Sequence, residues 1–423
     1  MHKPCHTGAA AANPGRTVPD ALRAPFGGSA AIGTSDAGDS FHDVVQTWAP
    51  DLLGPGFTAL RLPLGEDDEG PVSATLIRYR DPGRRRPSSR RTARKRGPEP
   101  PVVLYVHGWT DYFHQRDLAR FWSDRGCAFH ALDLRKYGRS LRDGQTPGYV
   151  DDLGAYDEDI DAALAAIAAD GHPSAPLVLM GHSTGGLVAS LWAARHPGRV
   201  HALVLNSPWL EAHGSALVRT TTTPVLEQLA RRRPRTALRL PAVDHYWRTL
   251  SDQADGEWEL DPRWRPRFSF PVRAGWLRAV VAGQQTVARG LDLDCPALVL
   301  TSARSVISPR WNERMRTADC VLDVTTMAQR ALDLGARVTV NRFDGALHDV
   351  LLSPAGIRAA VYTAMDQWAQ AYVFGSAASA IPALDPPAAV VGAAFSPDDV
   401  TAATTAQATS RSTSLPYRRS RRA

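Results

Sequence analysis

The hexapeptide Gly-His-Ser-Thr-Gly-Gly at residues 181–186 places the strongest constraint on how this chain can fold. It follows an apolar run at residues 176–180 and precedes a segment of helical periodicity that ends near residues 196–198. A G-x-S-x-G sequence between a strand and a helix is typical of a nucleophile elbow. Strand and helix backbones crowd together at such a turn, which requires small residues. Ser183 is therefore expected in a sparsely populated backbone conformation.

From residue 102 onward, strand and helix patterns alternate, which indicates an α/β fold. Several strands are continuous runs of leucine and β-branched residues, as expected of a mostly parallel sheet that helices cover on both faces. Two further strands precede the alternation. The expected strands are 57–64, 72–79, 102–106, 128–134, 177–180, 202–206, 297–301 and 337–343.

The alternation is interrupted at about residues 211–290, which are irregular or helical and rich in arginine and aromatic residues. An insertion there would lie above the carboxyl edge of the sheet, where open α/β sheets bind ligands, so we expect a helical lid. Its aromatic residues would form either an acyl-chain tunnel or the core of a small cap. Segments 1–45 and 375–423 have the composition of disordered chain, which leaves a folded domain at 46–374.

Basic residues are concentrated in two segments that we expect to be flexible. Eight lie between Arg84 and Arg96, inside an expected loop at 81–100, and four lie between Arg418 and Arg422. These twelve exceed the whole net charge of +6, so the rest of the chain is mildly acidic. Such segments can attract phosphate or anionic lipid head groups without sequence preference. We favour a solvated loop and tail, with at most weak membrane-surface contact and no specific nucleic-acid binding.

The sequence has no run near eighteen apolar residues and no signal-peptide pattern at its start, so we expect neither secretion nor membrane spanning. Its cysteines show no metal-binding or redox spacing, which favours a reducing cytoplasm and no metal site. The four cysteines are Cys5, Cys127, Cys295 and Cys320.

Candidate partners for Ser183 lie near the ends of the last two expected strands. A serine hydroxyl becomes a good nucleophile when a base removes its proton and a third group orients that base. His348 follows the last strand through a glycine turn and is the expected base. Asp319, 29 residues before His348, is the expected acid, and Asp323 is its rival. The resulting order Ser…Asp…His is the order known for a nucleophile elbow of this kind.

Attack by Ser183 would create an oxyanion that needs hydrogen-bond donors already in place. One expected donor is the backbone N–H of Thr184, at the start of the helix that follows the elbow. The other is the N–H of Trp109, in the turn after the strand at 102–106. The Trp109 side chain would either line the acyl site or serve in ordinary packing.

Together these segments resemble the α/β-hydrolase superfamily, and within it the monoacylglycerol lipase and lysophospholipase branch, also described as serine aminopeptidase-like. The resemblance covers roughly residues 57–372. There are two departures. Lys136 and Tyr137 stand where glycine and often histidine are usual, and residues 302–317 lengthen the link between a strand and the acid. The segments that carry the resemblance are 107–109, 133–140, 181–186, 318–319 and 345–348.

This resemblance implies an α/β-hydrolase fold and a serine hydrolase that cleaves carboxylic esters without a metal or organic cofactor. Lipid-like esters, such as a monoacylglycerol or a lysophospholipid, are the expected substrates. One alternative is peptide or amide hydrolysis by the same triad, with Glu257 and Glu259 receiving a substrate ammonium group. Another is a hydrolase-fold binding protein without catalysis. Acyl-chain length and oligomeric state stay open.

Overall fold

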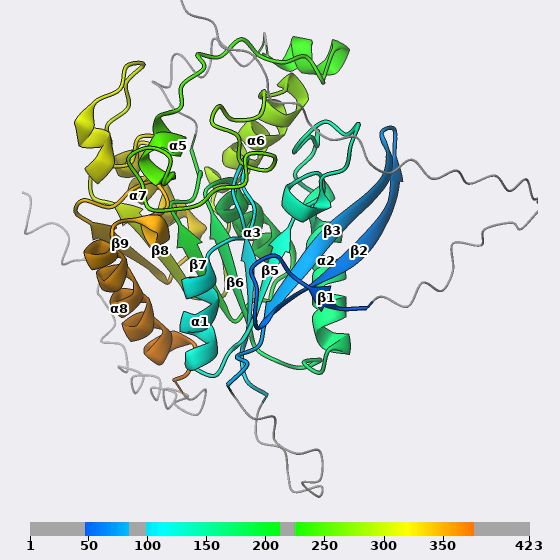
Figure 1. The fold of residues 1–423 in the computed structure, drawn as a ribbon, viewed down its shortest axis with the longest axis vertical. Coiled ribbons are helices and arrows are strands. Elements are labelled where there is room, and N and C mark those ends of the chain that lie inside the picture. The colour runs from blue at the N-terminus through cyan, green and yellow to red at the C-terminus, as the bar shows by residue number, and fades with distance from the viewer. Residues whose placement is uncertain (1–46, 84–98, 212–223, 225, 376–423) are drawn as a thin grey trace, which may run out of the picture. The chain divides into compact units, whose positions relative to one another are not determined.

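The computed structural model describes residues 47–83, 99–211, 224 and 226–375, which form a nine-stranded sheet with helices on both faces (Figure 1). The strand order is β1-β2-β3-β5-β4-β6-β7-β8-β9. The pairs β1–β2, β2–β3 and β3–β5 are antiparallel. All pairs from β5 to β9 in this order are parallel. The strands are β1 (Ala49–Pro50), β2 (Phe57–Asp67), β3 (Gly70–Tyr79), β4 (Val102–Val106), β5 (Ala128–Asp133), β6 (Leu177–His182), β7 (Ala202–Asn206), β8 (Ala297–Ser302) and β9 (Val338–Phe343).

The predicted mostly parallel α/β sheet is confirmed, and each of the eight expected strands is present. Only β1, which is two residues long, was not expected, because so short a strand leaves no periodic pattern. Side chains alternate between the two faces of the sheet, as the two-residue repeat of a strand requires. On β4, Leu104 packs into the core cluster that contains α2 and α3, whereas Tyr105 packs into the cluster that contains α1 and α8. The helices are α1 (Arg116–Asp124), α2 (Ala155–Ala169), α3 (Thr184–Arg195), α5 (His245–Leu250), α6 (Ala274–Val287), α7 (Val324–Arg330) and α8 (Ala355–Tyr372).

The stretch between β7 and β8 contains two different kinds of structure. Helix α6 belongs to the helical layer, because Val280 and Val287 are fully buried in the core. A Cβ at Gly283 would lie 2.9 Å from a methyl group of Leu191, so the glycine allows α6 to pack closely on α3. Helix α5 instead lies over the ends of β7 and β8 (Figure 1). Of these two helices, α5 is thus the one at the sheet edge, where the lid is expected.

The expected disordered segment 1–45, nearly all of 375–423, and most of the basic loop at 81–100 lie outside the described residues. Over the residues that are described, no helix has both the length and the apolar character that crossing a bilayer demands. The described cysteines Cys127, Cys295 and Cys320 carry free thiols.

Candidate active site

The turn between β6 and α3 holds Ser183 in a strained backbone conformation. Its φ is 51° and its ψ is −117°, a combination that non-glycine residues rarely adopt. Gly185 makes this turn possible, because a Cβ there would lie 2.2 Å from the carbonyl oxygen of His107. The glycines of the motif therefore bring the elbow into direct contact with the turn after β4.

Three side chains from separate segments meet at the carboxyl ends of the parallel strands. His348 Nε2 lies 3.1 Å from Ser183 Oγ, and His348 Nδ1 lies 2.8 Å from Asp319 Oδ2. Ser183 is 8% exposed, and the other two side chains are essentially inaccessible to water. Gly345, with a φ of 76°, turns the chain after β9 so that His348 returns over the sheet edge. The structure thus brings together the three residues expected from the sequence.

The structure distinguishes between the two candidate acids. Asp319 Oδ1 accepts hydrogen bonds from the N–H groups of Val321 and Leu322 at 2.7 and 2.8 Å, which leaves Oδ2 for His348. Asp323 is the N-cap of α7, and its carboxylate accepts hydrogen bonds from the first turn of that helix. Asp319 is therefore the carboxylate that contacts the imidazole.

The longer link before Asp319 does not displace it. The backbone N–H of Asp319 donates to the Arg304 carbonyl at 2.9 Å, and the Val306 N–H donates to the Asp319 carbonyl at 2.8 Å. Ser305 and Asp319 thus form a parallel bridge, just beyond the end of β8. Residues 306–318, which we call the excursion, leave the sheet edge after Ser305 and return to it at Asp319, which is hydrogen-bonded to the chain on either side of Ser305. This closed base holds Asp319 beside the strand end despite the added length.

The turn after β4 packs against the elbow. A Cβ at Gly108 would lie 3.1 Å from Ser183 Cβ, a tighter contact than most Cβ atoms make, so glycine favours this close approach. His107 fixes the turn, because its Nε2 accepts the Leu134 N–H at 3.1 Å and its Nδ1 donates to the Gly108 carbonyl at 2.8 Å. A ring nitrogen that accepts a backbone N–H carries no proton, so His107 is neutral and protonated on Nδ1.

The two expected oxyanion donors, Trp109 and Thr184, follow directly after Gly108 and Ser183. Among the described residues, the backbone N–H groups of Trp109 and Thr184 have no hydrogen-bond acceptor. The Trp109 ring lies 3.8 Å from the ring of Trp276 on α6 and edge-on to Tyr137. The Trp109 side chain is therefore part of the packing between this turn and the helical layer.

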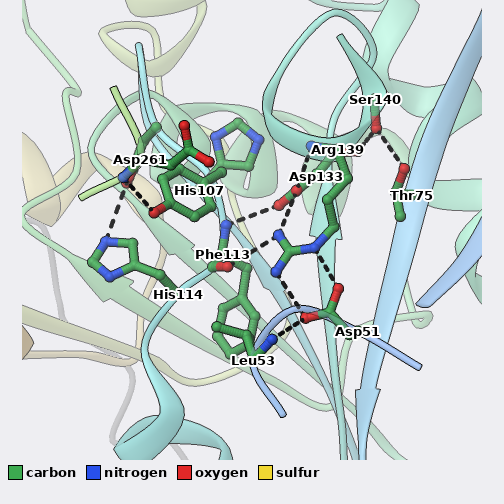
Figure 2. A network of polar contacts seen from close by, with 12 residues as sticks. Asp51, Leu53, Thr75, His107, Phe113, His114, Asp133, Arg139, Ser140 and Asp261 are labelled. Atoms are coloured by element: carbon green, nitrogen blue, oxygen red, sulfur yellow. Dashed lines mark hydrogen bonds and ion pairs between the residues drawn. The ribbon is translucent and has the colours of Figure 1, made fainter. Parts of the chain in front are cut away.

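A buried ion pair supports the loop that follows this turn (Figure 2). The Asp133 carboxylate accepts the Phe113 N–H at 2.8 Å and the Arg139 guanidinium at 2.8 Å. Arg139 also donates to both carboxylate oxygens of Asp51, at 2.6 and 2.9 Å. Burial opposes the charge on Arg139, but the two carboxylates outweigh it and raise the pKa of the guanidinium. The Asp133–Arg139 pair thus joins the end of β5 to the turn beside the nucleophile.

Replacing Arg139 with methionine is expected to lower the free energy of unfolding by about 3–5 kcal/mol, because the buried Asp133 carboxylate would lose its cationic partner. Urea unfolding followed by circular dichroism measures this loss. Arg120→Met is the matched control, since Arg120 and Asp117 are both about half exposed and such pairs contribute at most about 1 kcal/mol. Equal midpoints for the two variants would contradict a supporting role for the buried pair.

The departure at Lys136 has a structural explanation. Lys136 has a φ of 61°, in the left-handed region that glycine adopts most easily. The side chain is 1% exposed, and its ammonium group contacts Asp67 at 2.5 Å and Glu69 at 2.6 Å in the β2–β3 hairpin. The ion pairs offset the backbone strain of a non-glycine residue at this position.

Residues of the stretch between β7 and β8 also reach the site. The Tyr246 hydroxyl lies 3.2 Å from His182 Nε2, and the Tyr246 ring lies edge-on to His348 at 5.1 Å. Arg265 is 4% exposed and donates to Asp111, in the turn after β4, at 2.6 Å. Tyr246 was one of several aromatic candidates in the sequence, whereas the Arg265–Asp111 pair joins residues 154 positions apart and has no local signal.

The sequence profile of the family described as serine aminopeptidase, S33, matches residues 97–355. The chain belongs to this family of α/β-hydrolases. The match spans the elbow, the acid segment and the histidine segment, so the geometry above lies within the family's own domain.

Curated relatives of this S33 family member agree with the assignment. A monoacylglycerol lipase of Mycolicibacterium smegmatis is 30% identical over 219 residues, which cover 51% of this chain and 73% of the relative. Lysophospholipase L2 of Escherichia coli is 24% identical over 273 residues, which cover 61% of this chain and 76% of the relative. These relatives confirm the resemblance to the monoacylglycerol lipase and lysophospholipase branch, and the chain is an enzyme of the lipase and esterase type.

Solved structures show the same fold. A soluble variant of the monoglyceride lipase of Saccharomyces cerevisiae, in complex with a substrate analogue, superposes on this S33 family member with a TM-score of 0.51 at 16% identity. The match covers 73% of this chain and 94% of that structure. At this identity the likeness establishes the fold alone.

Proposed function

We propose that this chain hydrolyses carboxylic esters through an acyl-enzyme formed on Ser183. His348 accepts the Oγ proton as Ser183 attacks the acyl carbonyl, while Asp319 orients the imidazole and stabilises its positive charge. His348 then donates that proton to the leaving alcohol and activates a water molecule to release the acid. The observation that carries the proposal is the continuous hydrogen-bonded path from Ser183 Oγ through His348 to Asp319.

The oxyanion of the tetrahedral intermediate would be stabilised by the N–H groups of Trp109 and Thr184. Trp109 follows Gly108 and Thr184 follows Ser183. Gly108 packs directly on Ser183, so the two donors lie on adjoining turns. Thr184 also begins α3, and the partial positive charge at a helix N-terminus favours an oxyanion. Preorganised donors cost no rearrangement at the moment of attack, so a turn fixed by His107 suits this role.

Lipid-like esters are the substrate class that we propose, on the strength of relatives named as a monoacylglycerol lipase and a lysophospholipase. Amide hydrolysis would require an acidic group near the nucleophile to receive a substrate ammonium. Glu257 and Glu259 instead line a cavity of about 880 Å³ whose lining residues include neither Ser183 nor His348. The position of these two carboxylates favours ester hydrolysis over amide hydrolysis. A cytoplasmic location, which the scattered free cysteines favour, is part of the same proposal.

The test is a panel of p-nitrophenyl esters with short, medium and long acyl chains, run beside a monoacylglycerol, a lysophosphatidylcholine and an aminoacyl amide. We expect ester turnover, with kcat/KM rising for the lipid-like substrates. Preferred turnover of the amide would favour the peptidase alternative. If an active-site-directed fluorophosphonate failed to label the folded protein and no substrate were cleaved, the non-catalytic alternative would replace the proposal.

A further inference from the structure

The residue after His348 is a buried carboxylate that no cation pairs with among the described residues. Asp349 is 0% exposed, and its carboxylate accepts three hydrogen bonds from neutral donors in the described part of the chain. These donors are the amide of Asn206 at 2.6 Å, the N–H of Leu351 at 3.0 Å and the amide of Gln115 at 3.3 Å. Burying a carboxylate is costly, and these hydrogen bonds offset part of that cost. Against the opposing effect of burial, Asp349 also helps to raise the pKa of the buried Arg265 guanidinium, so the two groups interact electrostatically without a direct ion pair.

Asn206, the last residue of β7, connects this carboxylate to the nucleophile. Its side-chain amide donates to Asp349, and its side-chain oxygen accepts the Val350 N–H at 3.1 Å. Its backbone carbonyl accepts the Ser183 N–H at 3.0 Å and the ring Nδ1–H of His182 at 3.1 Å. One fully buried residue thus holds the backbone of the elbow on one side and the segment that follows His348 on the other.

We propose that Asn206 and Asp349 are positioning residues that keep Ser183 Oγ and His348 Nε2 within proton-transfer distance. The inference rests on the proposed serine hydrolase function. The Ser183–His348 contact of 3.1 Å is near the long end of the range over which a base can take a proton. A shift of about 1 Å in either group costs roughly 100-fold in rate. The shortest hydrogen bond of Asp349 joins it to a residue 143 positions earlier in the chain.

Three variants test the pair, each compared with the wild-type chain in the ester assay. Asn206→Leu keeps the size of the side chain and removes both of its hydrogen bonds. Asn206→Asp places a second carboxylate against Asp349. Asn206→Asp combined with Asp349→Asn reverses the pairing, so that an amide at 349 can again donate to an oxygen at 206. Asn341→Asp on β9 makes the same chemical change outside the site and is the matched control.

We expect kcat to fall by about 100-fold in Asn206→Leu and in Asn206→Asp, with KM within about threefold of the wild-type value. The kcat of the double variant should be at least about tenfold higher than that of Asn206→Asp, because complementary partners interact non-additively. A structural role alone would not produce loss of kcat at constant KM together with rescue. Thermal melting confirms that each variant is folded at the assay temperature, and Asn341→Asp should match the wild type.

The proposal is overturned if Asn206→Leu keeps kcat within about threefold, if KM changes in place of kcat, or if the double variant is as impaired as Asn206→Asp. The rate of fluorophosphonate labelling gives the same comparison without reference to a substrate. A wild-type chain that is neither labelled nor active would refute the hydrolase function itself. An active wild type with unimpaired variants would refute only the positioning role.

Discussion

Replacing Ser183 with alanine is expected to lower kcat for ester hydrolysis by about 10⁵- to 10⁶-fold. The substitution removes the atom that would form the acyl-enzyme, which is the hydroxyl oxygen 3.1 Å from His348 Nε2. Steady-state assays with p-nitrophenyl esters measure the loss, and intact-mass analysis after fluorophosphonate treatment shows whether any label is still incorporated. The change removes one oxygen atom at a position 8% exposed, so the variant should fold normally.

Ser190→Ala provides the control for this experiment. Ser190 lies on α3, the helix that begins directly after Ser183. Its hydroxyl donates to the Gly186 carbonyl and not to the imidazole. It should keep wild-type kcat, with at most a small drop in melting temperature. Substantial turnover by Ser183→Ala, or label on another residue, would assign the nucleophile elsewhere.

Asp319→Asn is expected to lower kcat by about 10⁴-fold with little change in structure. In the wild type, Asp319 Oδ1 accepts two backbone N–H groups and Oδ2 faces His348. The oxygen of an asparagine would stay with those N–H groups and turn its NH₂ toward His348 Nδ1. The imidazole would then carry its proton on Nε2, and that nitrogen could no longer accept the proton of Ser183. Assays at pH 8 with a p-nitrophenyl ester measure the effect.

Asp323→Asn is the paired measurement, because Asp323 is the rival acid only four residues away. Its carboxylate caps α7, and asparagine is about as good an N-cap as aspartate. We expect kcat within about twofold of wild type and an unchanged fold. If Asp323→Asn caused the larger loss, the contact between Asp319 and His348 would not describe the active enzyme.

The fold, Ser183 and His348 could be predicted from local signals in the sequence, whereas Asp319 is expected with Asp323 as a rival. Ser183 lies in a glycine-rich turn between an apolar strand and a helix, and His348 follows a strand through Gly345. The acid could not be chosen with the same security, because Asp319 and Asp323 both precede short apolar or helical segments. The contact of Asp319 with His348 and the role of Asp323 as the N-cap of α7 make the distinction, and both depend on the tertiary arrangement.

Contacts between residues far apart in the chain were beyond sequence analysis for a different reason. Asn206 and Asp349 lie on β7 and after β9, and each has an ordinary local explanation as a strand end or a helix cap. Arg265 and Asp111 become partners only because the chain before α6 folds back over the turn after β4. Periodicity and motif spacing describe neighbours along the chain, whereas these pairs depend on the tertiary arrangement.

The closed base of the excursion separates the position of Asp319 from the length of the chain before it. The hydrogen bonds at the base hold Asp319 beside Ser305, so the position of the carboxylate does not depend directly on the length of residues 306–318. The excursion carries Trp311, which packs against His245 and Arg248 of α5, the helix that brings Tyr246 to His348. A substitution at Trp311 would therefore alter the packing of α5, and through it the surroundings of His348, while the hydrogen bonds that hold Asp319 stay in place.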